Sequence, residues 1–366
     1  MNQPDQSTEL VPTELAATEL APLDPARYAK QILFAGIGEA GQRRIAAAHV
    51  LVVGCGALGT VIAESLARAG VGRLRIVDRD FVELSNLQRQ VLFDEQDVAD
   101  HLPKAVAAVR KLERINSAIA LEPVVADVNA SNILGLMRDV DLVLDGADNF
   151  EVRYLVNDAS LETGIPWIYG GCVGSHGQTL AIFPHQTACL RCLIESAPGP
   201  GEGATCDTAG VVGPIVNVIA SLQVTDALKY LSGQRERIAP FLTVVDVWEP
   251  SLRRMSVAGL RERANCPACQ GGERAWLSGT QGSRTAVLCG RNAVQVSPPR
   301  DSPLDLAALA TRLQPLGRVQ RNPYLLRFAP QGESCELTIF PNGRAIIKGT
   351  DDAGIARGLY ARYLGS

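Results

Sequence analysis

Residues 50–59 read VLVVGCGALG, and they begin the strand–helix–strand unit from which the fold class follows. An apolar run rich in valine enters Gly54, Gly56 and Gly59, which have the G-x-G-x-x-G spacing, and apolar residues at helical spacing follow. These glycines permit a tight turn and a close approach to a phosphate at the N-terminus of the next helix. The next strand, RLRIVDRD, carries Asp78 where it can accept hydrogen bonds from ribose hydroxyls. The unit predicts a nucleotide site without naming the nucleotide; the alternative is a packing turn that binds no ligand.

Helix and strand patterns continue to alternate after this first strand–helix–strand unit. The sequence predicts, beginning with a helix, alternating helices and strands over 103–116, 119–125, 129–138, 141–148, 151–163 and 166–173. Such alternation is typical of a doubly wound, Rossmann-like α/β fold, in which helices cover both faces of a mostly parallel sheet. Further strands follow, together with a long apolar helix that ends at Gly233.

Composition divides the chain into four parts. Residues 1–26 carry a recurring Thr-Glu-Leu triplet and are predicted to be a disordered tail, and residues 27–272 form the main domain. Residues 273–283 have the composition of a linker. Residues 284–366 predict a small α+β domain, whose hairpin CELTIFPNGRAIIKG turns at an Asn-Gly pair.

Charge and cysteine content limit the classes of partner. The 366-residue chain has a net charge of −4, which gives no electrostatic reason to expect a nucleic acid or an anionic membrane surface as partner. Its apolar runs are too short to span a membrane, and its N-terminus lacks the pattern of a signal peptide. Nine cysteines without an export signal predict a reducing, cytoplasmic location, where cysteines serve metals or catalysis more often than disulfides.

A dense polar cluster follows the strand that carries Asp78. Residues 85–90 read SNLQRQ and place Asn86 and Arg89 beside the predicted phosphate site. A dinucleotide dehydrogenase has no use for these donors there. An enzyme that cleaves ATP at the α-phosphate does, because negative charge builds on the phosphoryl oxygens in the transition state. Arg89, Asn86 and Lys104 are therefore candidates to stabilise that charge.

Asp148 ends the predicted strand DLVLDGAD, where a parallel sheet binds its ligands, and is a candidate to hold Mg²⁺. Each of these residues also has an ordinary structural interpretation. Arg89 could form a surface salt bridge, Lys104 could be a solvated helix start, and Asp148 could cap a turn. Their joint occurrence at successive strand ends favours the functional interpretation.

Two C-x-x-C pairs, CLRC and CPAC, have the ligand number and local spacing of a tetrahedral structural zinc site. The four ligands would be Cys189, Cys192, Cys266 and Cys269. Because the pairs are more than seventy residues apart, the site would tie two distant loops together. A redox dithiol and simple packing cysteines are the alternatives.

Cys206 precedes the long apolar helix. A helix N-terminus favours the thiolate, which makes Cys206 a candidate nucleophile. Its position fits a structural cysteine equally well.

Together these motifs resemble the MoeB/ThiF/HesA family, the bacterial relatives of ubiquitin-activating enzymes. The resemblance covers roughly residues 27 to 270. It is carried, in order, by RYAKQILFAGIGEAGQRRI, VLVVGCGALG, VDRDFVELSNLQRQVLF, DLVLDGADN, CLRC, TCDTAGVVGP and CPAC. It implies an enzyme that uses ATP and Mg²⁺ to adenylate the C-terminal Gly-Gly carboxylate of a ubiquitin-like sulfur carrier protein of the ThiS/MoaD type, releasing pyrophosphate. The acyl-adenylate then receives sulfur to become a thiocarboxylate.

The resemblance also implies a structural Zn²⁺ and a homodimer. The C-terminal domain could select or dock the carrier, or it could contact a sulfurtransferase. Carried over by motif, Asp78 holds the ribose, Lys104 and Arg89 stabilise triphosphate charge, and Asp148 with Asn149 serves Mg²⁺ and ATP. Cys206 matches a loop cysteine that some members use for a thioester or acyl-disulfide intermediate. The residues expected to line ATP are Gly54, Gly56, Ala57, Gly59, Asp78, Ser85, Asn86, Leu87, Gln88, Arg89, Lys104, Asp148 and Asn149.

Three positions depart from the family pattern. Lys30 replaces an arginine that reaches into the partner subunit's ATP site, and it keeps the charge without the planar fork. Ala57 replaces a glycine and adds a methyl group near the phosphates. The short V-G-x-P-K loop reads VADHLPK, two residues longer, which leaves the approach of Lys104 to ATP open.

Two other functions stay open at this stage. The acceptor of AMP could be a peptide C-terminus or a modified tRNA base, or the chain could be a dinucleotide-binding scaffold without chemistry. The sequence names neither the carrier nor the sulfur donor.

Overall fold

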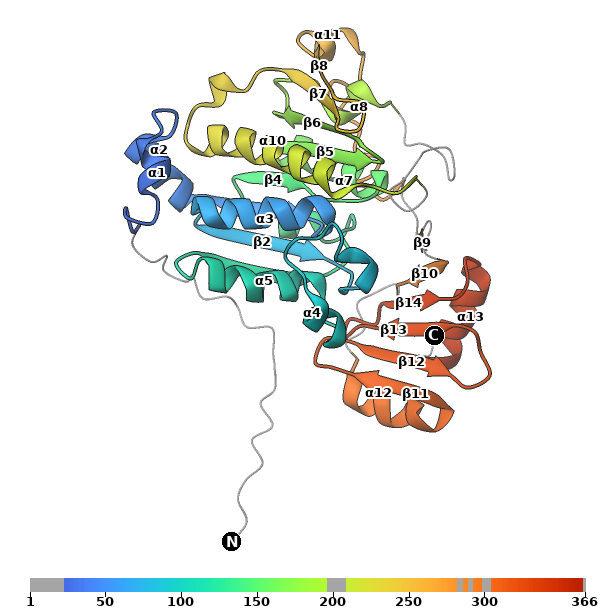
Figure 1. The fold of residues 1–366 in the computed structure, drawn as a ribbon. Coiled ribbons are helices and arrows are strands. Elements are labelled where there is room, and N and C mark those ends of the chain that lie inside the picture. Colours follow the sequence, from blue (N-terminus) through green and yellow to red (C-terminus); the bar gives the residue numbers. More distant parts are fainter. Residues whose placement is uncertain (1–22, 196–208, 282–285, 289–291, 298–303, 365–366) are drawn as a thin grey trace.

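The computed structural model describes residues 23–195, 209–281, 286–288, 292–297 and 304–364. Cys206 and most of the predicted tail lie outside these residues. The described chain forms two sheets with flanking helices, one before and one after residue 284 (Figure 1). No helix in the described part of the chain is long and apolar enough to cross a bilayer.

The large sheet has eight strands in the order β3-β2-β1-β4-β5-β6-β7-β8. The strands β1 to β5 pair in parallel, and β5 to β8 pair antiparallel. This confirms a mostly parallel sheet, extended at one edge. The strand bounds are β1 His49–Val53, β2 Arg73–Asp78, β3 Ala120–Val125, β4 Leu142–Asp145, β5 Trp167–Val173, β6 His176–Ile182, β7 Phe241–Asp246 and β8 Ser251–Ser256.

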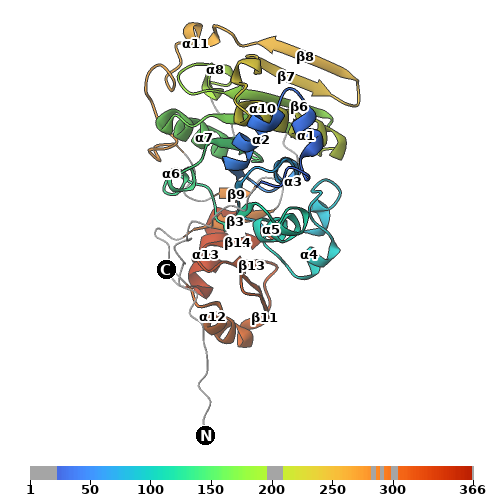
Figure 2. The same ribbon diagram turned by 90° about the vertical axis from the view of Figure 1, so that its left-hand side faces the viewer.

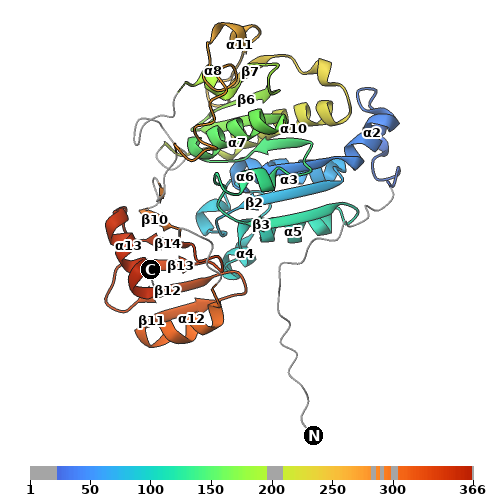
Figure 3. The same ribbon diagram turned by 180° about the vertical axis from the view of Figure 1, so that it is seen from behind.

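Helices cover both faces of this sheet, because its central strands bury side chains on both sides. Val50 and Val52 of β1 pack with α3, α5 and α10, whereas Leu51 and Val53 pack with α6 and α7. Figures 2 and 3 show α6 and α7 on the face opposite α3 and α5. The helix bounds are α1 Ala29–Leu33, α2 Gly38–Ala47, α3 Ala57–Ala69, α4 Glu95–Ala99, α5 Lys104–Ile115, α6 Ile133–Leu136, α7 Phe150–Thr163, α8 Leu190–Leu193, α10 Gly213–Leu231 and α11 Leu260–Arg263.

Strands β1, β2 and β3 follow one another toward one edge of the sheet, whereas β4 and the later strands lie toward the other edge. The strand order therefore switches between β1 and β4, which are neighbours. In parallel sheets this switch point is where ligands bind, beyond the carboxyl ends of the strands. The turns that follow the two strands touch here. A Cβ on Gly59 would lie 1.9 Å from the carbonyl oxygen of Gly54, and one on Gly146 would lie 2.5 Å from the same atom. Gly54 itself has a positive φ of 86°.

The C-terminal domain is a six-stranded antiparallel sheet in the order β11-β12-β13-β14-β10-β9. The helices α12 (Leu306–Leu313) and α13 (Ala353–Tyr363) bury their apolar residues in one shared core with this sheet. The domain lies beyond the end of the large sheet toward which β2 points (Figure 1). Its strand bounds are β9 Ala286–Leu288, β10 Ala293–Val296, β11 Gly317–Arg321, β12 Leu326–Pro330, β13 Glu336–Ile339 and β14 Ala345–Lys348.

The segment predicted to be a linker lies against α7 through residues 274–277. The ring of Trp276 stacks on Tyr154, with 5.3 Å between centroids. The Trp276 backbone N–H also donates to Asp158 Oδ2 at 3.0 Å.

The contact between the glycine turns predicts a steep loss of stability in Gly59→Ala. The added methyl group would overlap backbone that has no way to move aside, so we expect a loss of at least about 2 kcal/mol in the free energy of unfolding. Gly135→Ala is the matched control, because a Cβ there meets nothing within 4 Å and alanine favours its helix. Thermal unfolding measures both, and an unchanged melting temperature for Gly59→Ala would contradict this account of the turn.

Candidate active site

The Asp78 carboxylate is the anchor of the predicted nucleotide site. Its Oδ2 accepts a hydrogen bond from the Cys55 N–H at 2.7 Å, and its Oδ1 accepts one from the Asp80 N–H at 2.7 Å. Burial raises the pKa of Asp78, and the nearby charge of Lys104 opposes that rise. The side chain therefore fixes the glycine turn after β1 to the end of β2.

Gly56 differs from the other glycines of this turn. A Cβ built there would have Gln90 Nε2 at 4.0 Å as its nearest neighbour, so protein packing does not demand glycine. Gly56 caps the N-terminus of α3, where unpaired N–H groups bind anions. The open space at Gly56 fits the close approach of a phosphate, whereas Gly54 and Gly59 are required by the backbone itself.

The polar cluster after β2 is held by its own backbone. Glu83 and Asn86 form a reciprocal cap on the short 3₁₀ turn Leu84–Asn86, in which Asn86 Oδ1 accepts from the Glu83 N–H at 3.0 Å. Arg89 is half-buried and donates from Nη1 to the carbonyl of Ser85 at 2.8 Å. Gln88 and Ser85 are exposed and Leu87 is half-buried. The cluster is thus a folded loop at the carboxyl end of β2.

Lys104 does not behave as a solvated helix start, and that alternative is wrong. The residue is only 3% exposed, and its Nζ lies 3.3 Å from Asp80 Oδ2. Its N–H donates to the Asp80 carbonyl at 2.9 Å, so the longer VADHLPK loop still brings Lys104 against the end of β2. Asp80 was missed by sequence reasoning, although it stands two residues after Asp78 at the same strand end.

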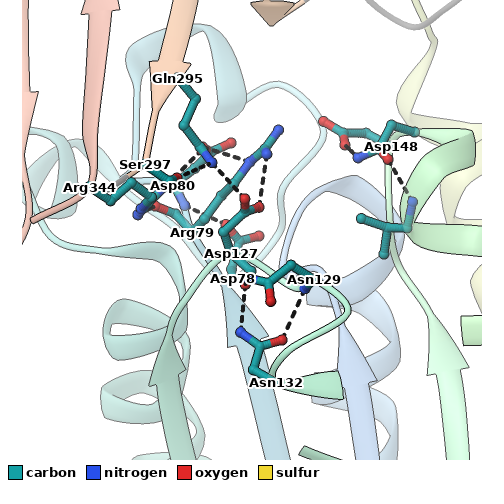
Figure 4. Close-up of polar contacts among 12 residues, drawn as sticks. Asp78, Arg79, Asp80, Asp127, Asn129, Asn132, Asp148, Gln295, Ser297 and Arg344 are labelled. Carbon is teal, nitrogen blue, oxygen red and sulfur yellow. Dashed lines mark hydrogen bonds and ion pairs between the residues drawn. The ribbon is translucent and has the colours of Figure 1, made fainter. Parts of the chain in front are cut away.

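Asp148 is exposed at the carboxyl end of β4, where Figure 4 shows it across from Asp78 and Arg79. Asn149 Nδ2 donates to Asp148 Oδ1 at 3.1 Å, and Asn149 Oδ1 caps α7 by accepting from Val152 N–H at 2.9 Å. Burial acts to lower the pKa of Arg79, but nearby Asp127, Asp80 and Asp148 raise it above its usual value. Asp148 therefore acts on the same charged region as the β2 end.

A buried ion pair close to Asp148 in the sequence was also not predicted. Arg153 Nε lies 3.0 Å from Asp145 Oδ2, with the two side chains 9% and 3% exposed. Arg153 Nη2 donates to the carbonyls of Ala147 at 2.7 Å and Gly170 at 3.0 Å. Burial raises the pKa of Asp145, and the positive charge of Arg153 opposes it. The ion pair orients the loop that carries Asp148. The sequence signal that could have predicted it is Asp145, an aspartate at the end of a buried strand.

Lys30 is the predicted site residue that lies apart from this group. Lys30 is exposed on α1, which lies at the opposite end of the sheet from the C-terminal domain (Figure 1). Within one protomer it therefore does not join the cluster of Asp78, Lys104 and Asp148. Cys206 lies outside the described residues.

The four paired cysteines do come together. Their ligand atoms all lie within 4.8 Å of one another. Sulfur–sulfur distances are 3.8 Å for Cys189 to Cys192, 3.6 Å for Cys189 to Cys266 and 3.5 Å for Cys192 to Cys269. Four thiolates at about 2.3 Å from a tetrahedral zinc are separated by about 3.8 Å, so the cluster has the dimensions of a structural zinc site.

The chemistry of the cluster also fits a divalent cation. A hydrogen bond from Cys192 lowers the pKa of Cys189 to about 5, whereas burial raises the pKa of Cys269 to about 12. The sulfurs therefore cannot all be thiolates on their own, and a bound cation would supply the missing positive charge.

The sequence of the main domain matches a known family. The ThiF family model matches residues 28–268. The chain belongs to the ThiF family. A Bacillus subtilis protein named sulfur carrier protein ThiS adenylyltransferase is 45% identical over 340 residues, covering 93% of this chain and 99% of that protein. This match is longer than the stretch before residue 284, so it includes part of the C-terminal domain.

Other relatives cover less of the chain. A sulfur carrier protein adenylyltransferase of Thermus thermophilus is 39% identical over 249 residues, which are 66% of this chain and 90% of that protein. Among solved structures, E. coli MccB with ATP matches with a TM-score of 0.56 and 23% identity, covering 67% of this chain and 73% of that one. This last likeness shows the fold alone.

The cysteine geometry predicts that Cys266→Ser loses bound metal. We expect purified protein to contain one zinc per chain, and the variant to lose it and to melt at a lower temperature, because the thiolates then lack their shared cation. Elemental analysis and thermal unfolding measure the two effects. Cys335→Ala is the control, since Cys335 is buried in the C-terminal core and outside the cluster. Full zinc retention in Cys266→Ser would exclude this site as the metal ligand set.

Proposed function

We propose that this chain is an ATP-dependent adenylyltransferase that activates the C-terminal Gly-Gly carboxylate of a ubiquitin-like sulfur carrier protein of the ThiS type. The observation that carries the proposal is the convergence of the glycine turn, Asp78, Lys104 and Asp148 at the carboxyl ends of β1, β2 and β4. Relatives over most of the chain are named adenylyltransferases of such carriers. The location expected for this reaction is the cytoplasm.

The proposed reaction is a displacement at the α-phosphorus of ATP. A carboxylate oxygen of the carrier attacks this phosphorus, the bond to the bridging oxygen of the β-phosphate breaks, and pyrophosphate leaves. Asp78 would hold the ribose, and the N-terminus of α3 would face the phosphates. Arg89, Asn86 and Lys104 would donate to the phosphoryl oxygens as their charge grows.

Mg²⁺ fits the carboxylate of Asp148, because hard cations take oxygen ligands, and Asn149 lies beside it. When bound, Mg²⁺ would neutralise phosphate charge. Cys206 is a candidate to attack the acyl carbon in a later step, with AMP as leaving group. The four clustered cysteines, which pack in the same core as α7, would hold a structural zinc.

A homodimer is part of the proposal. Leu33 and Phe34, at the end of α1, are 76% and 64% exposed, and Val218 on α10 is 37% exposed. Such apolar side chains favour burial against a second copy. In that arrangement Lys30 would reach the partner's nucleotide site. We also propose a sulfurtransferase as a partner, in contact with the C-terminal domain.

Arg89→Ala should reduce carrier-dependent exchange of labelled pyrophosphate into ATP by about 10²-fold, the cost of removing one donor to a growing oxyanion. Arg68→Ala is the matched control, because Arg68 pairs only at the surface with Glu64 and should exchange normally. Intact-mass analysis of the carrier should show the added mass of AMP. Exchange that ignores the Gly-Gly tail would contradict the proposed acceptor.

Lys30→Ala and Asp148→Ala proteins should each be inactive, yet a mixture that exchanges subunits should recover part of the activity. A mixed dimer contains one site with its own Asp148 and the partner's intact Lys30. Pyrophosphate exchange measured before and after mixing tests this. If Lys30 served its own protomer, both sites of the mixed dimer would be defective and no activity would return.

A further inference from the structure

The C-terminal domain packs directly on the chain that leaves β2. One face of its sheet buries α12 and α13, and residues of the opposite face, including Phe340 and Ile346, form an apolar cluster with Phe81. Phe81, Phe340 and Ile346 are 5%, 2% and 3% exposed. Phe81 stands three residues after Asp78, so the contact is made at the edge of the candidate active site.

A buried arginine joins the two domains at the neighbour of Asp78. Arg344, between β13 and β14, is 2% exposed. Its Nη2 donates to the carbonyl of Arg79 at 2.5 Å, and its Nη1 donates to Gln295 Oε1 at 3.1 Å. Burial lowers the pKa of Arg344 to about 10, so the guanidinium is still charged at neutral pH. A buried charge requires such partners, and one of them is the backbone of the main domain.

The same arginine belongs to a closed circuit of polar contacts that includes the backbone carbonyl of Arg79 (Figure 4). Gln295 Nε2 donates to Asp127 Oδ2 at 2.5 Å, and Asp127 Oδ1 pairs with Arg79 Nη1 at 2.9 Å. Arg79 is therefore held at its carbonyl by Arg344 and at its side chain by Asp127. Since Asp78 precedes Arg79, the circuit fixes the direction in which β2 ends.

A second attachment holds the loop that carries Asn86. Lys348, at the end of β14, forms an ion pair with Glu83. Glu83 is the residue that caps the turn with Asn86. Lys348 and Phe81 also lie within cation–π distance, at 5.3 Å from Nζ to the ring centroid.

A third attachment holds the loop that leads to Lys104. Asn322 Nδ2 donates to the carbonyl of His101 at 2.9 Å and to that of Asp100 at 3.3 Å. Arg327 Nη1 lies 3.2 Å from His101 Nδ1. His101 has a positive φ of 52°, a conformation that needs such support outside glycine. Asp100 and His101 belong to the VADHLPK loop, which is two residues longer than the V-G-x-P-K pattern of the family.

We infer that the C-terminal domain positions the nucleotide site, with Arg344 as the principal positioning residue. The domain does so by contacting the two segments that carry Asp78, Asn86 and Lys104. The inference rests on the proposed function, because it takes these residues to bind ATP. The three attachments act on backbone and loops beside the site, so their loss changes the placement of the ATP-binding groups without removing any of them.

The test measures ATP affinity by calorimetry on the full chain, without carrier, for Arg344→Met. We expect the dissociation constant for ATP to rise about tenfold, the effect of losing a buried hydrogen bond to a charged group. In pyrophosphate exchange the KM for ATP should rise in parallel while the KM for carrier stays within about twofold. Arg362→Met is the matched control in the same domain, because Arg362 is exposed and pairs with Glu333 of that domain; it should change neither constant.

Since Arg344 is buried, a second variant guards against misfolding. The double variant Asn322→Asp with Lys348→Met removes the ion pair of the second attachment and the Asn322 hydrogen bonds of the third. An aspartate at 322 keeps the oxygen that accepts from the N–H groups of Tyr324 and Leu325, so the turn inside the domain survives. The double variant should also weaken ATP binding.

Unchanged ATP affinity in both folded variants would overturn the positioning role. If the wild-type chain binds ATP but shows no carrier-dependent exchange, the proposed acceptor fails while calorimetry still decides on the positioning role. If the wild-type chain binds no ATP, both proposals fall together.

Discussion

The Asp78 carboxylate accepts backbone N–H groups from two strand ends, and the surrounding site depends on that shared acceptor. Cys55 ties it to the turn after β1, and Asp80 ties it to the chain after β2. With the Asp80 backbone held, its side chain faces Lys104 at 3.3 Å. A buried carboxylate is costly unless it is hydrogen-bonded, so the two N–H donors stabilise Asp78, and Asp78 in turn fixes the two strand ends. The positive charge of Lys104 adds to the stabilisation of the carboxylate.

Local sequence patterns predicted the parallel strands and helices of the main domain because each strand–helix–strand unit has its own periodicity and glycine turn. The Asn-Gly hairpin of β13 and β14 was predicted for the same reason. The helix expected over 129–138 is only the single turn α6, Ile133–Leu136, and the strand β11 was missed. The alternating exposure of GRVQR shows that β11 lies half-buried beside β12, a pairing that its polar sequence does not signal.

The parallel sheet made the site partly predictable, because carboxyl ends of parallel strands meet at one edge. Asp78, Lys104 and Asp148 were proposed as site residues in this way. Contacts that depend on long-range packing were not predicted. They are the ion pair of Asp145 with Arg153, the ion pair of Asp80 with Lys104, and every contact with the C-terminal domain. The spacing of the C-x-x-C pairs predicted the cysteine cluster although 77 residues separate Cys189 from Cys266, because four thiols of this spacing have few other uses.

The docking of the C-terminal sheet on the end of β2 has a thermodynamic consequence. If its contacts shape the nucleotide site, then nucleotide binding and domain docking share one coupling free energy, and the coupling acts equally in both directions. A bound nucleotide would then hold the distal sheet in place as firmly as that sheet organises the site. Heat would separate the two units in stages when the site is empty, and would melt them as one cooperative body when it is filled.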